Sequence, residues 1–163
     1  MASYRSAKTG YFKPKNTGKY KGKTPITYRS GLEYKLMVCL DLSQKILQWG
    51  SESVVVNYLD PTRLTLNNCP TIHRYFIDFY FITYDVRTKQ NKKYYVEVKP
   101  YQETVPPVRG KKKMKTYMNE SITYARNVSK WKAAIEHAKK NNGTFKIFTE
   151  QDIGQMTPIF LKK

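Results

Sequence analysis

Two acidic residues and a lysine stand out because they interrupt apolar strand patterns. Asp78 lies within the aromatic and β-branched run of residues 75–82, and Glu97 and Lys99 end the run that begins at Tyr94. Side chains alternate between the two faces of a strand, so Glu97 and Lys99 project from the same face. Charged side chains are rarely buried in a central strand unless they are paired or bind a metal. Two carboxylates beside an amine would suit a divalent cation and water attack on a phosphodiester.

A hairpin would bring these three side chains together. The polar stretch over residues 87–93 joins the two runs and is typical of a hairpin connection. Antiparallel pairing would then place Asp78, near the start of the first strand, close to Glu97 and Lys99, near the end of the second. The alternative is a pair of ordinary ion pairs, Glu97 with Lys99 and Asp78 with one of the many other lysines.

Glu33 is a candidate third carboxylate. Ser30 and Glu33 match the S-x-x-E capping box, and this pattern precedes apolar residues at helical spacing, namely Leu32, Leu36, Cys39 and Leu40. A helix-capping role is sufficient to explain a glutamate at position 33. However, Glu33 also lies on or beside the apolar face, where an unpaired carboxylate is costly and a metal ion or a partner would relieve that cost. Glu33, Asp78 and Glu97 would then hold Mg²⁺, for which Mn²⁺ can substitute, while Lys99 offsets charge developing on the phosphate.

The charge balance predicts a polyanionic partner. The chain of 163 residues has 30 Lys and Arg against 12 Asp and Glu, which gives a net charge of +18. Nucleic acid is the leading candidate, and binding through the backbone would give weak sequence specificity. No apolar run approaches the roughly 18 residues of a membrane-spanning helix, and the N-terminus lacks a signal peptide's apolar core. The sequence therefore predicts a soluble protein of cytosolic origin without a membrane partner.

Two segments concentrate the basic residues. Residues 1–25 carry seven Lys and Arg and no acid, with interleaved aromatics and no regular period. They predict a basic arm that is disordered alone, followed by a domain over residues 26–163. A basic loop is expected next to the carboxylates, where it would contact DNA phosphates unless it is simply solvated; its residues are Arg109, Lys111, Lys112, Lys113 and Lys115. Further candidate DNA contacts are Arg29, His73 and Arg126.

The remaining patterns predict one α/β domain. Short strands are expected over residues 46–49 and 53–58, a turn at Asp60-Pro61 and a loop over residues 59–71. Asn119 would cap a long helix, and a last strand over residues 144–149 would complete a parallel βαβ unit with the strand ending at Lys99. The predicted buried stripe of that helix is Ile122, Ala125, Val128, Trp131, Ile135 and Ala138.

The order of these features resembles the PD-(D/E)XK nuclease superfamily. Ile77-Asp78 followed nineteen residues later by Glu97-Val98-Lys99 is similar to its motif, with isoleucine in place of the usual proline. Glu33 lies on the helix where this superfamily often places a third acidic ligand. The resemblance implies an αβββαβ, restriction-endonuclease-like core with a mixed central sheet flanked by helices.

A closer resemblance extends over residues 19–154. It is to the head completion nucleases of large tailed bacteriophages, which are related to the endonuclease subunit of a heteromeric bacterial transposase. The residues that carry it are Tyr28-Arg29-Ser30, Leu32-Glu33, Trp49, His73-Arg74-Tyr75-Phe76, Glu97-Val98-Lys99-Pro100-Tyr101, Pro106-Pro107 and Lys130-Trp131-Lys132-Ala133-Ala134.

This resemblance implies a Mg²⁺-dependent endonuclease that cuts duplex or branched DNA late in phage capsid assembly. It would process or protect packaged DNA ends with portal or neck proteins as partners, in the host cytoplasm during assembly and in the virion afterwards. It also makes Lys130 a further active-site residue, although a solvated helix lysine is the alternative. Two other functions remain open: a non-catalytic DNA-binding connector of the virion, and an RNA-binding module supported only by the tyrosines and net charge. The oligomeric state is left open.

Overall fold

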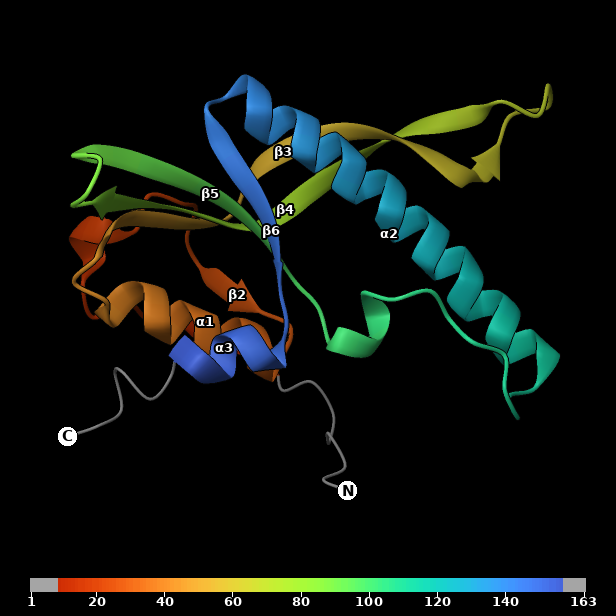
Figure 1. The fold of residues 1–163 in the computed structure, drawn as a ribbon, viewed down its shortest axis with the longest axis horizontal. Coiled ribbons are helices and arrows are strands. Elements are labelled where there is room, and N and C mark those ends of the chain that lie inside the picture. The colour runs from red at the N-terminus through yellow and green to blue at the C-terminus, as the bar shows by residue number, and fades with distance from the viewer. Residues whose placement is uncertain (1–8, 157–163) are drawn as a thin grey trace.

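The computed structural model describes residues 9–156 as a mixed α/β fold with a restriction-endonuclease-like core (Figure 1). A four-stranded sheet has the order β3-β4-β5-β6, and β1 and β2 form a small antiparallel sheet. The strands are β1 (Gly10–Phe12), β2 (Ile26–Tyr28), β3 (Ile46–Leu64), β4 (Pro70–Asp85), β5 (Gln90–Val98) and β6 (Gly143–Phe148). The helices are α1 (Gly31–Leu42), α2 (Met114–Lys140) and α3 (Glu150–Met156), with short 3₁₀ turns η1 (Thr17–Lys19) and η2 (Tyr101–Glu103).

Helices cover both faces of the sheet. Helices α1 and α3 lie on one face and α2 lies on the other (Figure 1). The alternation along β5 divides its side chains between two cores: Val96 and Val98 pack with α1 and α3, whereas Tyr95 packs with Ala134 and Ala138 of α2. The predicted division of this strand into two faces is therefore confirmed. By the same alternation, Glu97 and Lys99 lie on the face of the sheet that Tyr95 occupies.

The segment β5-α2-β6 forms the predicted βαβ unit. Strands β5 and β6 pair in parallel, from Lys93 opposite Gly143 to Val98 opposite Phe148. Strand β5 is thus held between β6 and the antiparallel β4, which makes it an inner strand of a mixed sheet. The end of an inner strand is a position from which side chains can reach several surrounding elements.

The β3–β4 hairpin is much longer than predicted. One strand replaces the two expected short strands and continues through Asp60-Pro61, so the predicted turn there is wrong, and the predicted loop over residues 59–71 is limited to residues 65–69. Strand β3 lies at the sheet edge, and its pairing with β4 is irregular between Asp60 and Leu64. Pro61 lies within this irregular segment, where a residue without an N–H group is tolerated. The hairpin extends beyond the rest of the sheet (Figure 1).

Helix α2 differs from its prediction in both start and orientation. It begins at Met114, so Asn119 is not its cap, and Lys113 precedes it without a side-chain capping bond. The buried positions are Asn127, Trp131, Ala134 and Ala138, whereas Ile122 and Ile135 are 45% and 41% exposed. The predicted stripe is therefore confirmed at Trp131 and Ala138 and wrong at Ile122 and Ile135, because the helix buries the polar Asn127 and the small Ala134 in their place. No helix within residues 9–156 combines the length and apolar character required to cross a membrane.

The described part of the basic arm packs against the domain. Strand β1 pairs with β2, and the backbone N–H groups of Lys15 and Asn16 donate to the buried Asp41 carboxylate. The rings of Phe12 and Tyr20 pack edge-on against Trp49, with distances between ring centres of 5.9 and 4.7 Å. The prediction that this segment lacks regular structure is therefore wrong for residues 9–25. Residues 1–8 of the arm and 157–163 of the predicted domain lie outside the described residues.

Candidate active site

The site begins where β4 and β5 separate. Their ladder ends at the pair Phe79–Val96, while β4 continues to pair with β3 through Ile77. Asp78 lies one step beyond the ladder, and its Oδ2 accepts a hydrogen bond of 2.8 Å from the Val98 N–H. The carboxylate therefore occupies the opening between the strands, next to the end of β5.

Glu97 is held on both of its carboxylate oxygens. Only 3% of the residue is exposed, and Lys99 Nζ lies 3.4 Å from Glu97 Oε1. The hydroxyl of Tyr75, which comes from β4, donates to Glu97 Oε2. The structure thus brings Asp78, Glu97 and Lys99 to one edge of the sheet, as the hairpin and the strand alternation predict.

The electrostatics of this group leave negative charge to be balanced. Burial and the neighbouring Glu97 raise the pKa of Asp78 well above its ordinary value, against the opposing effects of the Val98 N–H and Lys99. Burial alone would lower the pKa of Lys99, but Glu97, Asp78 and Glu103 outweigh it and raise that pKa, so Lys99 carries a full charge at neutral pH. Two close carboxylates thus share one ammonium, and a bound cation would offset the excess.

Lys130 faces this group from α2. Its Nζ lies 5.4 Å from the ring centre of Tyr75 and 5.7 Å from that of Tyr58. Burial lowers the pKa of Lys130, while Glu97 acts in the opposite direction. Tyr75 was not among the predicted site residues. Its place three residues before Asp78 was visible in the sequence, but the partner of its hydroxyl was not.

Glu33 forms the predicted capping box. Ser30 Oγ accepts from the Glu33 N–H at 3.1 Å, Ser30 Oγ donates to Glu33 Oε1 at 3.1 Å, and Glu33 Oε2 accepts from the Arg29 N–H at 2.8 Å. Its charge is also the weakest of the influences that raise the pKa of Asp78. Within residues 9–156, no three Asp, Glu, His or Cys side chains are grouped so that they could hold one metal ion. The structure therefore pairs Asp78 with Glu97, and a ligand role for Glu33 stays a prediction.

The predicted DNA contacts fall into two groups. The loop residues Arg109, Lys111, Lys113 and Lys115 are exposed, and Lys112 Nζ lies 2.6 Å from Glu120 Oε2. The others have partners within the protein: Arg126 binds Asp60 and Thr62, Arg29 pairs with Glu52, and His73 Nε2 lies 2.8 Å from Thr71 Oγ1. The loop thus contributes four exposed cations that are close together in the chain, whereas exposed Arg29 lies apart from them and is paired with Glu52.

The sheet is mixed and is flanked by helices, an aspartate lies on one strand, and a Glu-x-Lys sequence ends the neighbouring strand. Together these features define a PD-(D/E)XK-type nuclease domain. The family model described as TnsA-like endonuclease N terminal matches residues 43–150, and the chain belongs to this family. The matched segment contains Asp78, Glu97, Lys99 and Lys130. The head completion nuclease of Enterobacteria phage T4 is 35% identical over 152 residues, which cover 90% of this chain and 94% of the phage protein. The resemblance seen in the sequence is therefore confirmed.

Proposed function

We propose that this protein is a Mg²⁺-dependent DNA endonuclease of phage head completion, which processes or protects packaged DNA ends at the portal and neck. The observation that carries the proposal is the convergence of Asp78, Glu97 and Lys99 where β4 and β5 separate. The nuclease family and the name of the phage T4 relative support it. The expected partners are duplex or branched DNA and portal or neck proteins, in the host cytoplasm during assembly and in the virion afterwards.

The residues present fit Mg²⁺. This ion usually binds through one or two carboxylates and completes its shell with water and substrate phosphate oxygens. Asp78 and Glu97 would hold it, Glu33 is the proposed third ligand, and Mn²⁺ has similar preferences for oxygen ligands. Burial, together with the nearby Glu97, raises the pKa of Asp78, so a bound cation would stabilise its charged form. When bound, the ion would polarise the phosphate and acidify a coordinated water.

The two lysines have distinct tasks in this proposal. Lys99 stays protonated beside Glu97, so it would donate to the attacking water or to a phosphate oxygen and offset the developing charge. Lys130 has a lowered pKa and approaches from the helix on the other side of Tyr75. It would neutralise a second phosphate oxygen.

The basic loop would hold the DNA across this site. Its exposed Arg109, Lys111, Lys113 and Lys115, with Lys112, would contact phosphates without reading the base sequence. Arg29, His73 and Arg126 are further proposed contacts, but each must keep or exchange a partner within the protein. The loop therefore contributes most of the proposed affinity for DNA.

A cleavage assay on linear, nicked and branched DNA tests the proposal. Asp78→Asn removes one ligand charge and keeps the shape, so we expect cleavage with Mg²⁺ to fall at least about 100-fold while DNA binding survives. Glu33→Gln in the same assay tests the third ligand, because glutamine still accepts the Arg29 N–H. Asp85→Asn, at the opposite end of β4 from the site, is the matched control and should cut normally.

The alternative is a non-catalytic, structural DNA-binding protein of the virion neck. The retention of Asp78, Glu97 and Lys99 in one arrangement favours catalysis over this alternative. A wild-type protein that binds DNA but cuts none of the three forms with Mg²⁺ or Mn²⁺ would establish the structural function instead.

A further inference from the structure

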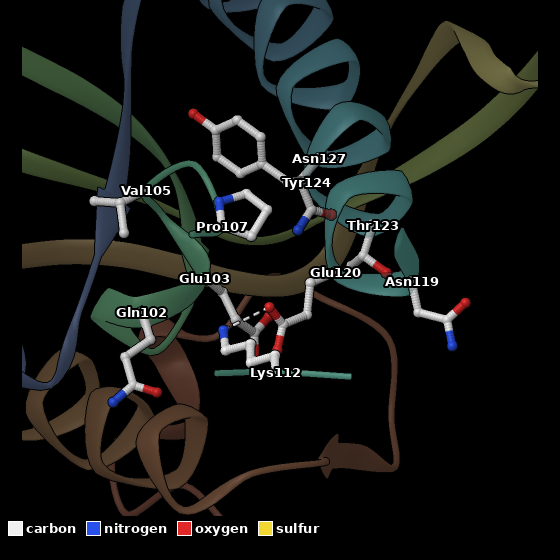
Figure 2. Close-up of a pocket in the computed structure, with 10 residues that line it drawn as sticks. All are labelled: Gln102, Glu103, Val105, Pro107, Lys112, Asn119, Glu120, Thr123, Tyr124 and Asn127. Carbon is white, nitrogen blue, oxygen red and sulfur yellow. Dashed lines mark hydrogen bonds and ion pairs between the residues drawn. The ribbon is translucent and has the colours of Figure 1, made fainter. Parts of the chain in front are cut away.

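A cavity of about 430 Å³ opens between η2 with its following loop and the first half of α2 (Figure 2). Val105 and Pro107 line it from the loop, and Tyr124 and Asn127 line it from the helix. Its volume falls in the range of small-molecule sites, roughly 300–1,000 Å³. It is therefore large enough for part of a substrate.

Each wall of the cavity is close along the chain to a lysine of the candidate active site. Glu103, on the wall formed by η2, follows Lys99 by only four residues along the chain. Asn127 lies three residues before Lys130, whose ammonium lies over the ring of Tyr75. One helical turn, a rise of about 5.4 Å, thus separates Asn127 on the cavity wall from Lys130 at the candidate active site. A nucleotide adjoining the scissile phosphate would reach it.

The lining matches a base better than a phosphate. The amides of Gln102, Asn119 and Asn127 offer both donors and acceptors, as the edges of bases do. Lys112 is the only cation among the described lining residues, and it is bonded to Glu120 on the cavity wall (Figure 2). A phosphate would meet carboxylates and no unpaired cation there. By contrast, an unpaired base would find hydrogen-bond partners.

A stacking surface and exposed cations accompany the hydrogen-bonding groups of the cavity. The ring of Tyr124 lies beside Pro107 in Figure 2, and such surfaces stack or pack against a base regardless of its identity. Outside, Lys111 and Lys113 flank Lys112 along the chain and are exposed. They can bind the phosphates of a strand whose base enters the cavity.

We propose that this cavity receives one unpaired base of the DNA substrate, next to the scissile phosphate. The protein then prefers DNA with an unpaired nucleotide, as at a branch or a frayed end, because inserting a paired base first requires breaking its pair and its stacking. This inference rests on the proposed function for its substrate class. It adds a structural preference that the carboxylates and lysines of the active site do not specify.

The test compares two oligonucleotide duplexes that differ by a single unpaired 2-aminopurine. Binding is followed without metal through the fluorescence of this base, and cleavage is followed separately with Mg²⁺. Thr123→Trp fills the cavity from an exposed lining position, and Ile122→Trp, exposed on α2 outside the lining, is the matched control. We expect wild type to bind the unpaired duplex about tenfold more tightly, Thr123→Trp to lose this preference, and Ile122→Trp to keep it.

Each outcome decides one proposal. Equal affinity of wild type for both duplexes, or a preference that survives in Thr123→Trp, overturns the inference, even where the paired duplex is cut as the proposed function requires. A preference that depends on Thr123 in a protein that cuts neither duplex supports the cavity and overturns the proposed catalysis. Circular dichroism checks folding, and Asn119→Trp, also exposed in the lining, replaces any variant that does not fold.

Discussion

Tyr75 connects the carboxylates to the helix that faces them. Its hydroxyl donates to Glu97, and its ring lies beneath the ammonium of Lys130. A hydrogen bond to a charged group contributes about 1.5–3 kcal/mol and also fixes the direction of the carboxylate. Tyr58 shares the contact with Lys130, but its hydroxyl lies 3.4 Å from Asp60 instead of Glu97. Both tyrosines contact Lys130 through their rings, but only Tyr75 donates a hydrogen bond to Glu97. Comparing variants of the two therefore isolates the effect of the hydroxyl on Glu97.

We expect Tyr75→Phe to slow cleavage about tenfold and to raise the Mg²⁺ concentration needed for half-maximal rate, since Glu97 loses its fixed donor. Tyr58→Phe keeps the ring under Lys130 and should change both quantities by less than about twofold. Single-turnover cleavage over a Mg²⁺ series measures the effect, and thermal unfolding shows whether both variants stay folded. Identical Mg²⁺ dependence in the two variants would contradict a positioning role for Tyr75.

At the scale of elements, one ion pair fixes α2 against the extended hairpin. Arg126 Nε lies 3.0 Å from Oδ2 of the buried Asp60, and Arg126 Nη2 donates to Thr62 Oγ1 at 2.7 Å. Burial would raise the pKa of Asp60, but hydrogen bonds from Thr62 and the charge of Arg126 outweigh it and lower that pKa. The same contact joins the middle of α2 to the hairpin, on the segment of the helix that also carries Asn127 and Lys130.

Asp60→Asn should reduce the free energy of unfolding by about 1–3 kcal/mol near neutral pH, because the guanidinium of Arg126 loses its partner. Since the folded-state pKa of Asp60 lies below its ordinary value of 3.8, its stabilising effect is complete above that value and is lost as pH falls through the folded pKa. The difference between wild type and variant should therefore shrink in acid. Urea unfolding at about pH 7 and about pH 3 measures it, and a difference independent of pH would disprove the assignment.

At the scale of the whole molecule, the net charge of +18 makes the DNA interaction dependent on salt. The acidic residues of the site and of the α2–hairpin contact are paired or buried, whereas the loop before α2 exposes several cations. Each phosphate contact releases condensed counterions, so the slope of log affinity against log salt counts the contacts. The loop's share can be measured by removing its charges.

Replacing Lys111 and Lys113 together by alanine should reduce that slope by about 1.8, since each phosphate contact contributes about 0.9. Lys35 and Lys139, exposed on α1 and at the end of α2, provide a control double variant with the same loss of charge. Fluorescence anisotropy between about 50 and 200 mM salt gives the slopes. An equal change in both double variants would mean that net charge, not the loop, governs binding.

Local pattern alone determined a large part of this protein. The alternation along β5 placed Glu97 and Lys99 on one face, the capping box located the start of α1, and the order of elements gave the βαβ unit. The first two features depend on residues within a few positions of one another, and the βαβ unit depends only on the order of elements that local patterns identify. Periodicity and hydrogen bonding to near neighbours therefore suffice to predict them.

Only the tertiary structure decided which face of α2 is buried, how far β3 extends, and what holds Glu97. Polar residues that face a site are indistinguishable in a sequence from polar residues that face water, so the apolar stripe of Ile122 and Ile135 gives no sign that Asn127 is buried instead. The bond from Tyr75 to Glu97 joins residues 22 positions apart. Such contacts arise from packing between distant segments, and no local propensity encodes them.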